Sequence, residues 1–175
     1  MELETERLLI REFRETDFTT THEYGSDLVV TRYTLFGPNE EKDTRDFLVR
    51  VVAEQKSDTR TGFDLAIELK AGSRHIGGIT LWVRGRETGE IGYVLHKDYW
   101  GKGYVPEAAR ALVDHAFRVL KLHRVYARCH TDNAGSVRVM EKIGMRREGQ
   151  LRKDLWMKGY WRDSYLYAIL DEEWR

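Results

Sequence analysis

The sequence contains little of what disulfide-linked, multidomain, membrane-spanning or nucleic-acid-binding proteins require. One cysteine, Cys129, in 175 residues excludes an internal disulfide and a zinc site built from several cysteines. Two prolines and the lack of a low-complexity tract leave no obvious linker between domains. No uncharged run reaches the roughly 18 residues of a membrane helix, and Lys plus Arg equal Asp plus Glu at 29 each. Neither a membrane span nor a basic surface for nucleic acid is therefore indicated.

These absences predict one domain over residues 1–175, which is long enough to bury a proper hydrophobic core. We find no charged segment followed by an apolar one of the kind that forms a secretory leader. A chain with one cysteine suits a reducing compartment. We therefore expect a cytoplasmic protein that binds neither nucleic acid nor membrane.

The most informative stretch combines a strand, a glycine loop and a helix between residues 90 and 116. Ile91, Tyr93 and Leu95 alternate with Gly92 and Val94, and this period of two is typical of a β-strand. The helix that follows the loop is expected to bury Ala108, Leu112, Ala116 and Val119, which recur at helical spacing.

The glycine loop at 100–104 (WGKGY) lies between this strand and this helix. Gly101 and Gly103 flank Lys102, so the backbone is free to curl with its N–H groups pointing one way. Pro106 and Glu107 then suit the first turn of a helix. A helix N-terminus with such a loop is a natural site for a phosphate or pyrophosphate. A corner whose glycines only make the turn is the alternative, since one glycine loop is a weak signal.

The remaining elements predict a mixed α/β domain. We expect, in chain order, a strand Leu8–Phe13, a helix from Thr16 or Asp17 to Gly25, a helix from Glu40 to Gln55 capped by Asn39, strands Phe63–Leu69 and His75–Val83, a strand Val125–Cys129, a helix Ala134–Ile143 ended by Gly144, and a last hairpin from strands Arg146–Leu151, Leu155–Met157 and Ser164–Leu170. This order implies an antiparallel meander and one parallel crossover around the glycine-loop helix.

Four motifs stand in a characteristic order: TERL at 5–8, the glycine loop with its helix start, NAGSV at 133–137 leading to EKIGM at 141–145, and GYWRD at 159–163. Together they resemble the GNAT superfamily of acetyl-CoA-dependent N-acetyltransferases, and more narrowly its RimJ/RimL-type branch. The resemblance covers nearly the whole chain. It implies a mixed, mostly antiparallel sheet of about seven strands, flanked by about four helices and splayed apart at the acetyl-CoA site.

The resemblance also implies which residues bind the cofactor. The pyrophosphate of CoA would be bound by Gly101, Lys102, Gly103, Tyr104 and Val105. A backbone N–H of Val94 or Leu95 would polarise the thioester carbonyl. The chain departs from the wider superfamily at Trp100, where Arg or Gln is frequent, and at Val105, where Gly or Ala is frequent. Backbone N–H groups make most of these contacts, so we expect binding to survive both departures.

Further residues carry predicted roles in catalysis by the same resemblance. Glu90 stands where a number of family members carry a general base that acts through water, and an ordinary turn residue is the alternative. Asn133 matches an asparagine that contacts the pantetheine arm, and it also suits the N-cap of the next helix. Ser136 is expected to donate to the CoA thiolate, because Met140 stands where many members have a tyrosine acid. A capping hydroxyl is the alternative for Ser136.

Several further residues are weaker candidates for a role in catalysis or acceptor binding. The branch places an acid in the strand after the second signature, where this chain has Leu155 with Asp154 beside it. A neighbouring strand residue points to the opposite face, so Asp154 is only a substitute base. His130 would relay a proton or be structural, and Cys129 is expected to be buried. Four aromatic residues line an acceptor cleft or belong to the core: Trp82, Trp156, Tyr160 and Trp161.

The sequence therefore predicts an enzyme that moves an acetyl group from acetyl-CoA to a primary amine, without a metal. The amine, on a protein N-terminus or a small molecule, would attack directly in a ternary complex. A CoA-binding module without catalysis remains open, because the tyrosine acid is missing. A P-loop nucleotide enzyme is less consistent with the chain, which lacks the full G-x-x-x-x-G-K-[ST] spacing. Strand edges in the last hairpin make a homodimer possible.

Overall fold

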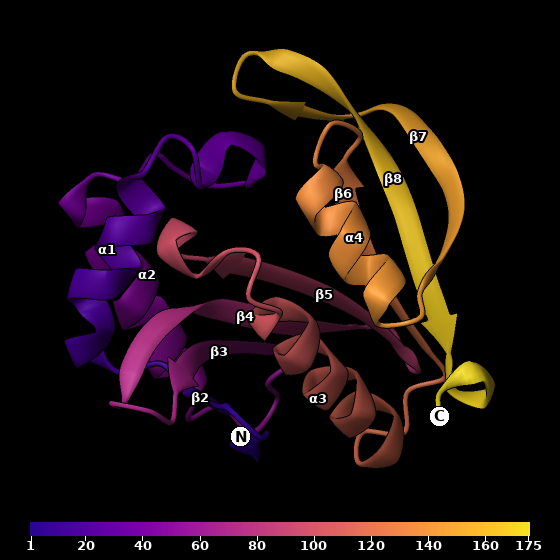
Figure 1. The fold of residues 1–175 in the computed structure, drawn as a ribbon, viewed down its shortest axis with the longest axis horizontal. Coiled ribbons are helices and arrows are strands. Elements are labelled where there is room, and N and C mark those ends of the chain that lie inside the picture. Colours follow the sequence, from indigo (N-terminus) through magenta and orange to yellow (C-terminus); the bar gives the residue numbers. More distant parts are fainter.

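Eight strands form one sheet in the computed structural model, which describes residues 1–175 (Figure 1). The strands are β1 Leu3–Glu4, β2 Leu8–Glu12, β3 Gly62–Leu69, β4 Arg74–Arg84, β5 Thr88–Leu95, β6 Arg124–His130, β7 Arg146–Met157 and β8 Tyr160–Leu170. Their order along the sheet is β1-β2-β3-β4-β5-β6-β8-β7. All neighbours are antiparallel except β5 and β6, which run parallel.

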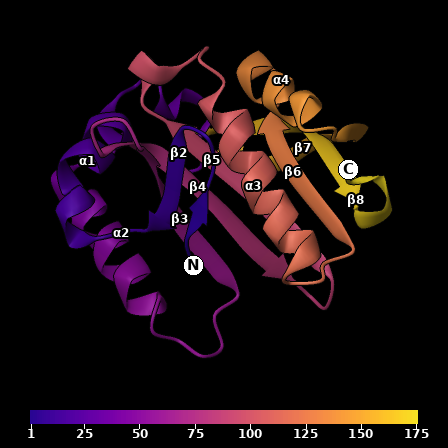
Figure 2. The same cartoon turned by 60° about the horizontal axis from the view of Figure 1, so that its bottom comes forward.

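Helices connect the strands and cover the sheet. The α-helices are α1 Phe18–Ser26, α2 Glu41–Glu54, α3 Tyr104–Arg118 and α4 Ala134–Lys142, and the 3-10 helices are η1 Glu15–Asp17, η2 Thr31–Tyr33, η3 Lys97–Tyr99 and η4 Asp171–Glu173. The crossover from β5 to β6 runs through α3. Figure 2 shows α3 and α4 beside one another in front of the strands. None of the helices has the length and apolarity needed to cross a membrane.

The predicted mixed α/β fold is confirmed, including the β3–β4–β5 meander and the single parallel crossover. The sheet has one strand more than the seven expected. The additional strand, β1, has two residues and pairs with β2 at the edge of the sheet. Two residues are too few for a periodic pattern, so the sequence gives no signal for this strand.

Two predictions at helix ends are wrong. Glu40, and not Asn39, is the N-cap of α2, and it forms a capping box with Asp43. The N–H of Asn39 instead donates to the carbonyl of Gly25, 2.8 Å away, and ties the two helices together. Val119 is 61% exposed because α3 ends at Arg118 and Val119 is its C-cap.

Two hydrophobic cores lie on opposite faces of the sheet. The larger packs the apolar side of α3 onto alternate strand residues that include Leu65, Ile67, Ile91 and Leu95. The smaller consists of Phe13, Leu48, Val51 and Ala66 and lies on the face next to α2. Because β3 contributes Leu65 and Ile67 to one core and Ala66 to the other, both faces of the central strands are covered.

The sheet opens between β5 and β6. These strands pair only from Thr88 opposite Arg124 to Glu90 opposite Tyr126. On the other side of β5, the N–H of His96 donates to the carbonyl of Ile76, 2.9 Å away. Hydrogen bonds in an antiparallel pair alternate along the strand, so even-numbered residues of β5 bond to β4. The backbone groups of its odd-numbered residues therefore point toward the gap.

Candidate active site

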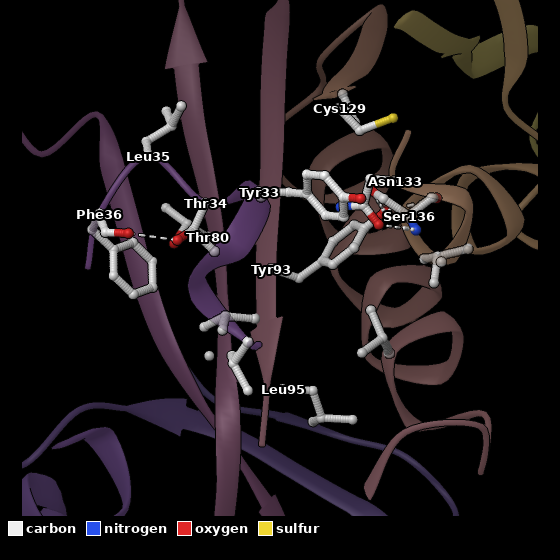
Figure 3. A pocket seen from close by; sticks show the side chains of 18 of the residues that line it. Tyr33, Thr34, Leu35, Phe36, Thr80, Tyr93, Leu95, Cys129, Asn133 and Ser136 are labelled. Atoms are coloured by element: carbon white, nitrogen blue, oxygen red, sulfur yellow. Dashed lines mark hydrogen bonds between the residues drawn. The ribbon is translucent and has the colours of Figure 1, made fainter. Parts of the chain in front are cut away.

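A cavity of about 1250 Å³ lies at this gap and is lined from both faces of the sheet. On the α3 and α4 side its walls include the glycine loop, Tyr93 and the start of α4, and on the other side they include Thr80 and Glu90. Figure 3 shows Tyr93 directed toward Ser136 and Asn133, with Thr80 and Phe36 at the other end of the cavity. One continuous space therefore gives access to the gap from both sides.

The glycine loop supplies a row of free backbone donors. None of the N–H groups from Gly101 to Val105 has an acceptor within the chain. Gly101 and Gly103 have φ angles of 75° and 81°, a region that strains residues with a side chain. The loop thus presents its N–H groups and the N-terminus of α3 to the cavity, which is the arrangement of an anion site. Lys102 is exposed, with its ammonium over the ring of Tyr99.

The N-terminal segment holds this loop from outside. The Glu107 carboxylate accepts hydrogen bonds from Thr5 Oγ1 at 2.6 Å and from Arg7 Nε at 2.7 Å. Arg7 also donates to the carbonyl of Lys102, 3.0 Å away, and lies over the ring of Tyr104. Glu107 lies in the first turn of α3, where a carboxylate suits the positive end of the helix dipole, as the sequence predicts. It is also the point at which the TERL segment fixes the start of α3.

The gap leaves strand groups of β5 without a partner strand. Leu95 is odd-numbered, so its N–H and carbonyl point toward the gap. The Trp100 indole N–H donates to that carbonyl at 2.8 Å, while the Leu95 N–H has no acceptor. Val94 also lines the cavity, but the register directs its N–H toward β4. Of the two predicted donors, Leu95 is therefore the one with a free N–H. Trp100 has a polar role that the sequence did not reveal.

Tyr93 and Ser136 form a hydroxyl pair that sequence reasoning missed. The Tyr93 hydroxyl lies 2.7 Å from Ser136 Oγ and 3.1 Å from the Ser136 carbonyl. Burial raises the pKa of Tyr93 well above its ordinary value, so the phenol stays neutral and able to donate. Met140 is fully buried. A tyrosine thus reaches the site from β5 and not from α4. The signal in the sequence was alternation, because Tyr93 shares a strand face with Ile91 and Leu95.

Asn133 begins α4 in the predicted way. Its side-chain oxygen accepts from the Ser136 N–H at 3.1 Å, and its side-chain amide donates to no other group of the chain. Asn133 and Gly135 both line the cavity. The cap orients the residue and leaves both N–H donors for a ligand.

Glu90 lies on the opposite face of the sheet, buried at 8% exposure. Its Oε1 accepts from Arg128 Nε at 3.2 Å and Nη2 at 2.9 Å, and its Oε2 accepts from Arg84 at 3.3 Å and Tyr126 at 3.1 Å. A carboxylate offers about four lone-pair sites, and these four donors occupy them. A proton can reach Glu90 only if one donor moves away.

The position of Asp154 in the last hairpin differs from the one that strand alternation predicts. Asp154 and Leu155 both line the cavity, although neighbouring residues were expected on opposite faces. The register of β7 and β8 shifts between Leu151 and Leu155, so simple alternation does not apply there. The carboxylate of Asp154 lies 3.9 Å from Arg128.

The other weak candidates are distributed around the cavity. His130 lines it, with its ring stacked on Tyr33 at 5.1 Å. Burial raises the pKa of the Cys129 thiol to about 11, so the thiol is a poor nucleophile. Trp82 lines the cavity. The other three aromatic residues are about half exposed on the hairpin and form no part of the core: Trp156 at 58%, Tyr160 at 46% and Trp161 at 54%. No group of three or more His, Cys, Asp or Glu side chains is arranged to hold a metal.

Comparisons with known proteins match this geometry. The family model described as "Acetyltransferase (GNAT) domain" matches residues 7–146. The uncharacterized N-acetyltransferase YnaD of Bacillus subtilis (strain 168) is 41% identical over 175 residues, which cover 99% of each chain. A crystal structure of a GNAT-family acetyltransferase from Bacillus anthracis is 41% identical, has a TM-score of 0.88, and covers 99% of this chain and 100% of that one. The putative ribosomal N-acetyltransferase YdaF of B. subtilis is 39% identical over 85 residues, 49% of this chain and 46% of that protein.

Proposed function

The chain belongs to the family of acetyltransferase (GNAT) domains, and on this premise we propose that it transfers the acetyl group of acetyl-CoA to a primary amine. The observation that carries the proposal is the row of five unpaired backbone N–H groups from Gly101 to Val105 at the N-terminus of α3. Donors of this kind fit a pyrophosphate without any side chain. Trp100 and Val105 therefore do not impair the site.

The cavity supports a defined orientation of CoA. The loop binds the pyrophosphate, and the free amide of Asn133 contacts the pantetheine arm where it enters the gap. Lys102 is placed to meet a phosphate at the exposed end, and Arg138 and Lys142 line the same cavity on α4. The arm thus takes the place of the missing strand partner of β5.

Two groups act on the thioester in this orientation. The N–H of Leu95 polarises the carbonyl, because it points into the gap and has no acceptor in the chain. Ser136 donates its hydroxyl proton toward the departing sulfur, and the Tyr93 hydroxyl, 2.7 Å from Ser136 Oγ, is the donor to Ser136 in this proposal. Cys129 takes no covalent part, because its thiol is buried and protonated. The amine attacks directly, forming the N–C bond as the C–S bond breaks, while both substrates are bound.

The acceptor enters from the face that carries Glu90. Glu90 takes the proton of the amine through water in this proposal, after Arg84, Arg128 or Tyr126 moves away from its carboxylate. The four motifs and the partial match to a putative ribosomal N-acetyltransferase support assignment to the RimJ/RimL-type branch. Within that branch the acceptor is a protein N-terminal α-amine or a small-molecule amine.

Thiol release from acetyl-CoA tests the proposal. We expect release that depends on an added primary amine and that stops when the amine is already acetylated. A protein that binds acetyl-CoA but releases no thiol with any amine would be the catalytically inactive module instead.

The pH profile in the same assay tests Glu90. Glu90→Gln keeps the shape but cannot take a proton, and loss of a general base lowers turnover by about 10²-fold or more. An unchanged rate and pH profile would remove Glu90 from the chemistry.

A further inference from the structure

Arg162 on β8 is a buried guanidinium without an anionic partner. It is 3% exposed and lines the cavity. Its Nε is buried and has no hydrogen-bond acceptor, and Nη2 makes a single bond of 3.4 Å to the carbonyl of Arg32. The guanidinium lies 5.0 Å from the centroid of the Tyr160 ring. That contact offsets part of the cost of burial, but it leaves the buried Nε–H without an acceptor.

The acidic side chains that three other strands contribute to the cavity do not neutralise it. Asp64 is 3.6 Å from Arg50, Glu90 is 2.9 Å from Arg128, and Asp154 is 3.9 Å from Arg128. Each acid that β3, β5 and β7 contribute to the cavity thus has another cation. No carboxylate of the chain lies within 4.0 Å of the Arg162 guanidinium nitrogens. An arginine buried in this way normally has a carboxylate or phosphate beside it.

Further positive charge surrounds Arg162. Lys158, at the tip of the β7–β8 hairpin, donates to the carbonyl of Thr31, and the charge of Arg162 contributes to a lowered pKa of Lys158, after burial. Arg32 has no acidic partner either. These contacts join the hairpin to the segment containing η2, and Figure 1 shows the hairpin reaching toward that segment. The end of the cavity that Arg162 and Arg32 line is therefore cationic.

We propose that Arg162 binds an oxyanion of the acceptor, so that the acceptor is a small amine carrying a carboxylate or phosphate. This inference rests on the proposed acetyl transfer and names its substrate class. A guanidinium presents a planar fork that matches both oxyanions. Polyamines are excluded as preferred acceptors, because they would bring further positive charge to an end of the cavity where Arg162 and Arg32 already lack acids.

The register of β8 against β6 shows how far Arg162 lies from the part of the cavity beside Ser164 and His130. Ser164 on β8 lies opposite His130 on β6, and both line the cavity. Arg162 is two residues further along β8, or roughly 7 Å, beyond the end of β6. The oxyanion would therefore lie at the outer end, with the amine pointing inward past Ser164 toward the gap.

Matched amines test the proposal. Thiol release is measured with an amino acid and its amide, with phosphoethanolamine and ethanolamine, and with a polyamine. We expect a lower KM for each anionic member, and the pair with the larger difference identifies carboxylate or phosphate. Arg162→Gln should raise the KM of the anionic members about ten- to hundredfold, as for the loss of a hydrogen bond to a charged group. The KM of the neutral members should not change. Arg162→Lys should restore part of the effect.

Arg152→Gln is the matched control, because Arg152 is an exposed arginine of the same hairpin and does not line the cavity. It should leave every KM unchanged. Equal KM values for anionic and neutral amines, or an equal effect of Arg162→Gln on both, would overturn the inference.

A binding measurement separates this inference from the proposed function. Thermal unfolding is followed with inorganic phosphate or acetate against chloride at equal ionic strength, with saturating CoA to occupy the glycine loop. We expect the oxyanion to raise the Tm of the wild type and of Arg152→Gln but not of Arg162→Gln. This outcome would support the anion site even if no amine were acetylated. Equal shifts in all three proteins would contradict it.

Discussion

At the scale of single residues, the proposed mechanism assigns stabilisation of the leaving thiolate to the Tyr93 and Ser136 hydroxyls. Their oxygens are 2.7 Å apart, and the Tyr93 phenol is neutral because burial raises its pKa. When Tyr93 donates to Ser136, the serine proton is free to point into the cavity, and the two hydrogen bonds polarise one another. The pair thus supplies from β5 and α4 what a single tyrosine would supply from α4 alone.

Ser136→Ala is predicted to lower kcat by about 10²-fold with little change in the KM for acetyl-CoA, because it removes a donor used mainly in the transition state. Tyr93→Phe should have a smaller effect. The double variant should be no slower than Ser136→Ala, since Tyr93 acts through Ser136. Initial rates of thiol release measure all three. Effects that multiply in the double variant would show that Tyr93 acts independently.

The sequence identified the residues around the gap better than those at the acceptor end. Asn133 and Ser136 belong to a recognisable motif, and Asn133 is the N-cap of α4 as predicted. Arg162 belongs to the GYWRD motif, but nothing in the sequence distinguishes it from an exposed arginine. Its burial depends on the fold of the hairpin against the η2 segment, which joins residues 130 positions apart. The hydrogen bonds of Glu90 with Tyr126 and Arg128 could not be predicted either, because they also join residues that are far apart in the sequence.

At the scale of elements, the glycine loop depends on the N-terminal segment that holds it. Glu107 accepts hydrogen bonds from Thr5 and Arg7, and Arg7 also holds the carbonyl of Lys102. Burial alone would raise the pKa of Glu107, but the hydrogen bonds from Thr5 and Arg7 lower it overall. The TERL motif therefore contributes to the cofactor site by fixing the loop and α3 relative to each other.

Glu107→Gln is predicted to weaken acetyl-CoA binding several-fold and to lower Tm at neutral pH. Loss of charged hydrogen bonds costs roughly 1.5–3 kcal/mol, or roughly 3–12 °C for a domain of this size. Because the folded pKa is lowered, the stabilisation by Glu107 is present above the ordinary value of 4.5 and is lost as pH falls through the folded value. The difference in Tm between wild type and variant should therefore shrink below pH 4.5.

Thermal unfolding from pH 7 to pH 3 measures this difference. Glu54→Gln is the control, since Glu54 pairs with Arg50 on the surface of α2, and exposed pairs contribute little. A Glu107→Gln protein with the Tm and the acetyl-CoA affinity of the wild type would mean that the contacts of Thr5 and Arg7 with Glu107 have no part in shaping the loop.

Most elements could be predicted because their patterns are local. The period of two in β5 and the helical period in α3 are read from neighbouring residues. The register shift in β7 is different, because Lys153 adopts a φ of 48° while its N–H donates to Asp163 on β8. Such a bulge depends on the partner strand, so alternation misplaced Asp154. The gap between β5 and β6 was expected only through the family resemblance.

At the scale of the whole molecule, the gap between β5 and β6 connects the two faces of the sheet. We propose that acetyl-CoA binds on one face and the amine on the other. The larger core packs against β4 and β5 from one face, and Gly78 of β4 lies against Phe13 of the smaller core on the other, while β6 diverges with α4 and the last hairpin. The donor side has unpaired N–H groups, and the acceptor side has buried charged side chains. Direct attack by the amine requires both regions to be occupied at once, and a continuous cavity permits this.

The central claim is that the glycine loop binds acetyl-CoA, and thermal unfolding with and without excess acetyl-CoA tests it most directly, with ATP as the control. At about 100 times the dissociation constant, a ligand adds roughly 2.7 kcal/mol to the free energy of unfolding, which corresponds to about 5–10 °C for this domain. The account predicts a rise of this size with acetyl-CoA and none with ATP. No rise with acetyl-CoA, or an equal rise with both, would contradict it.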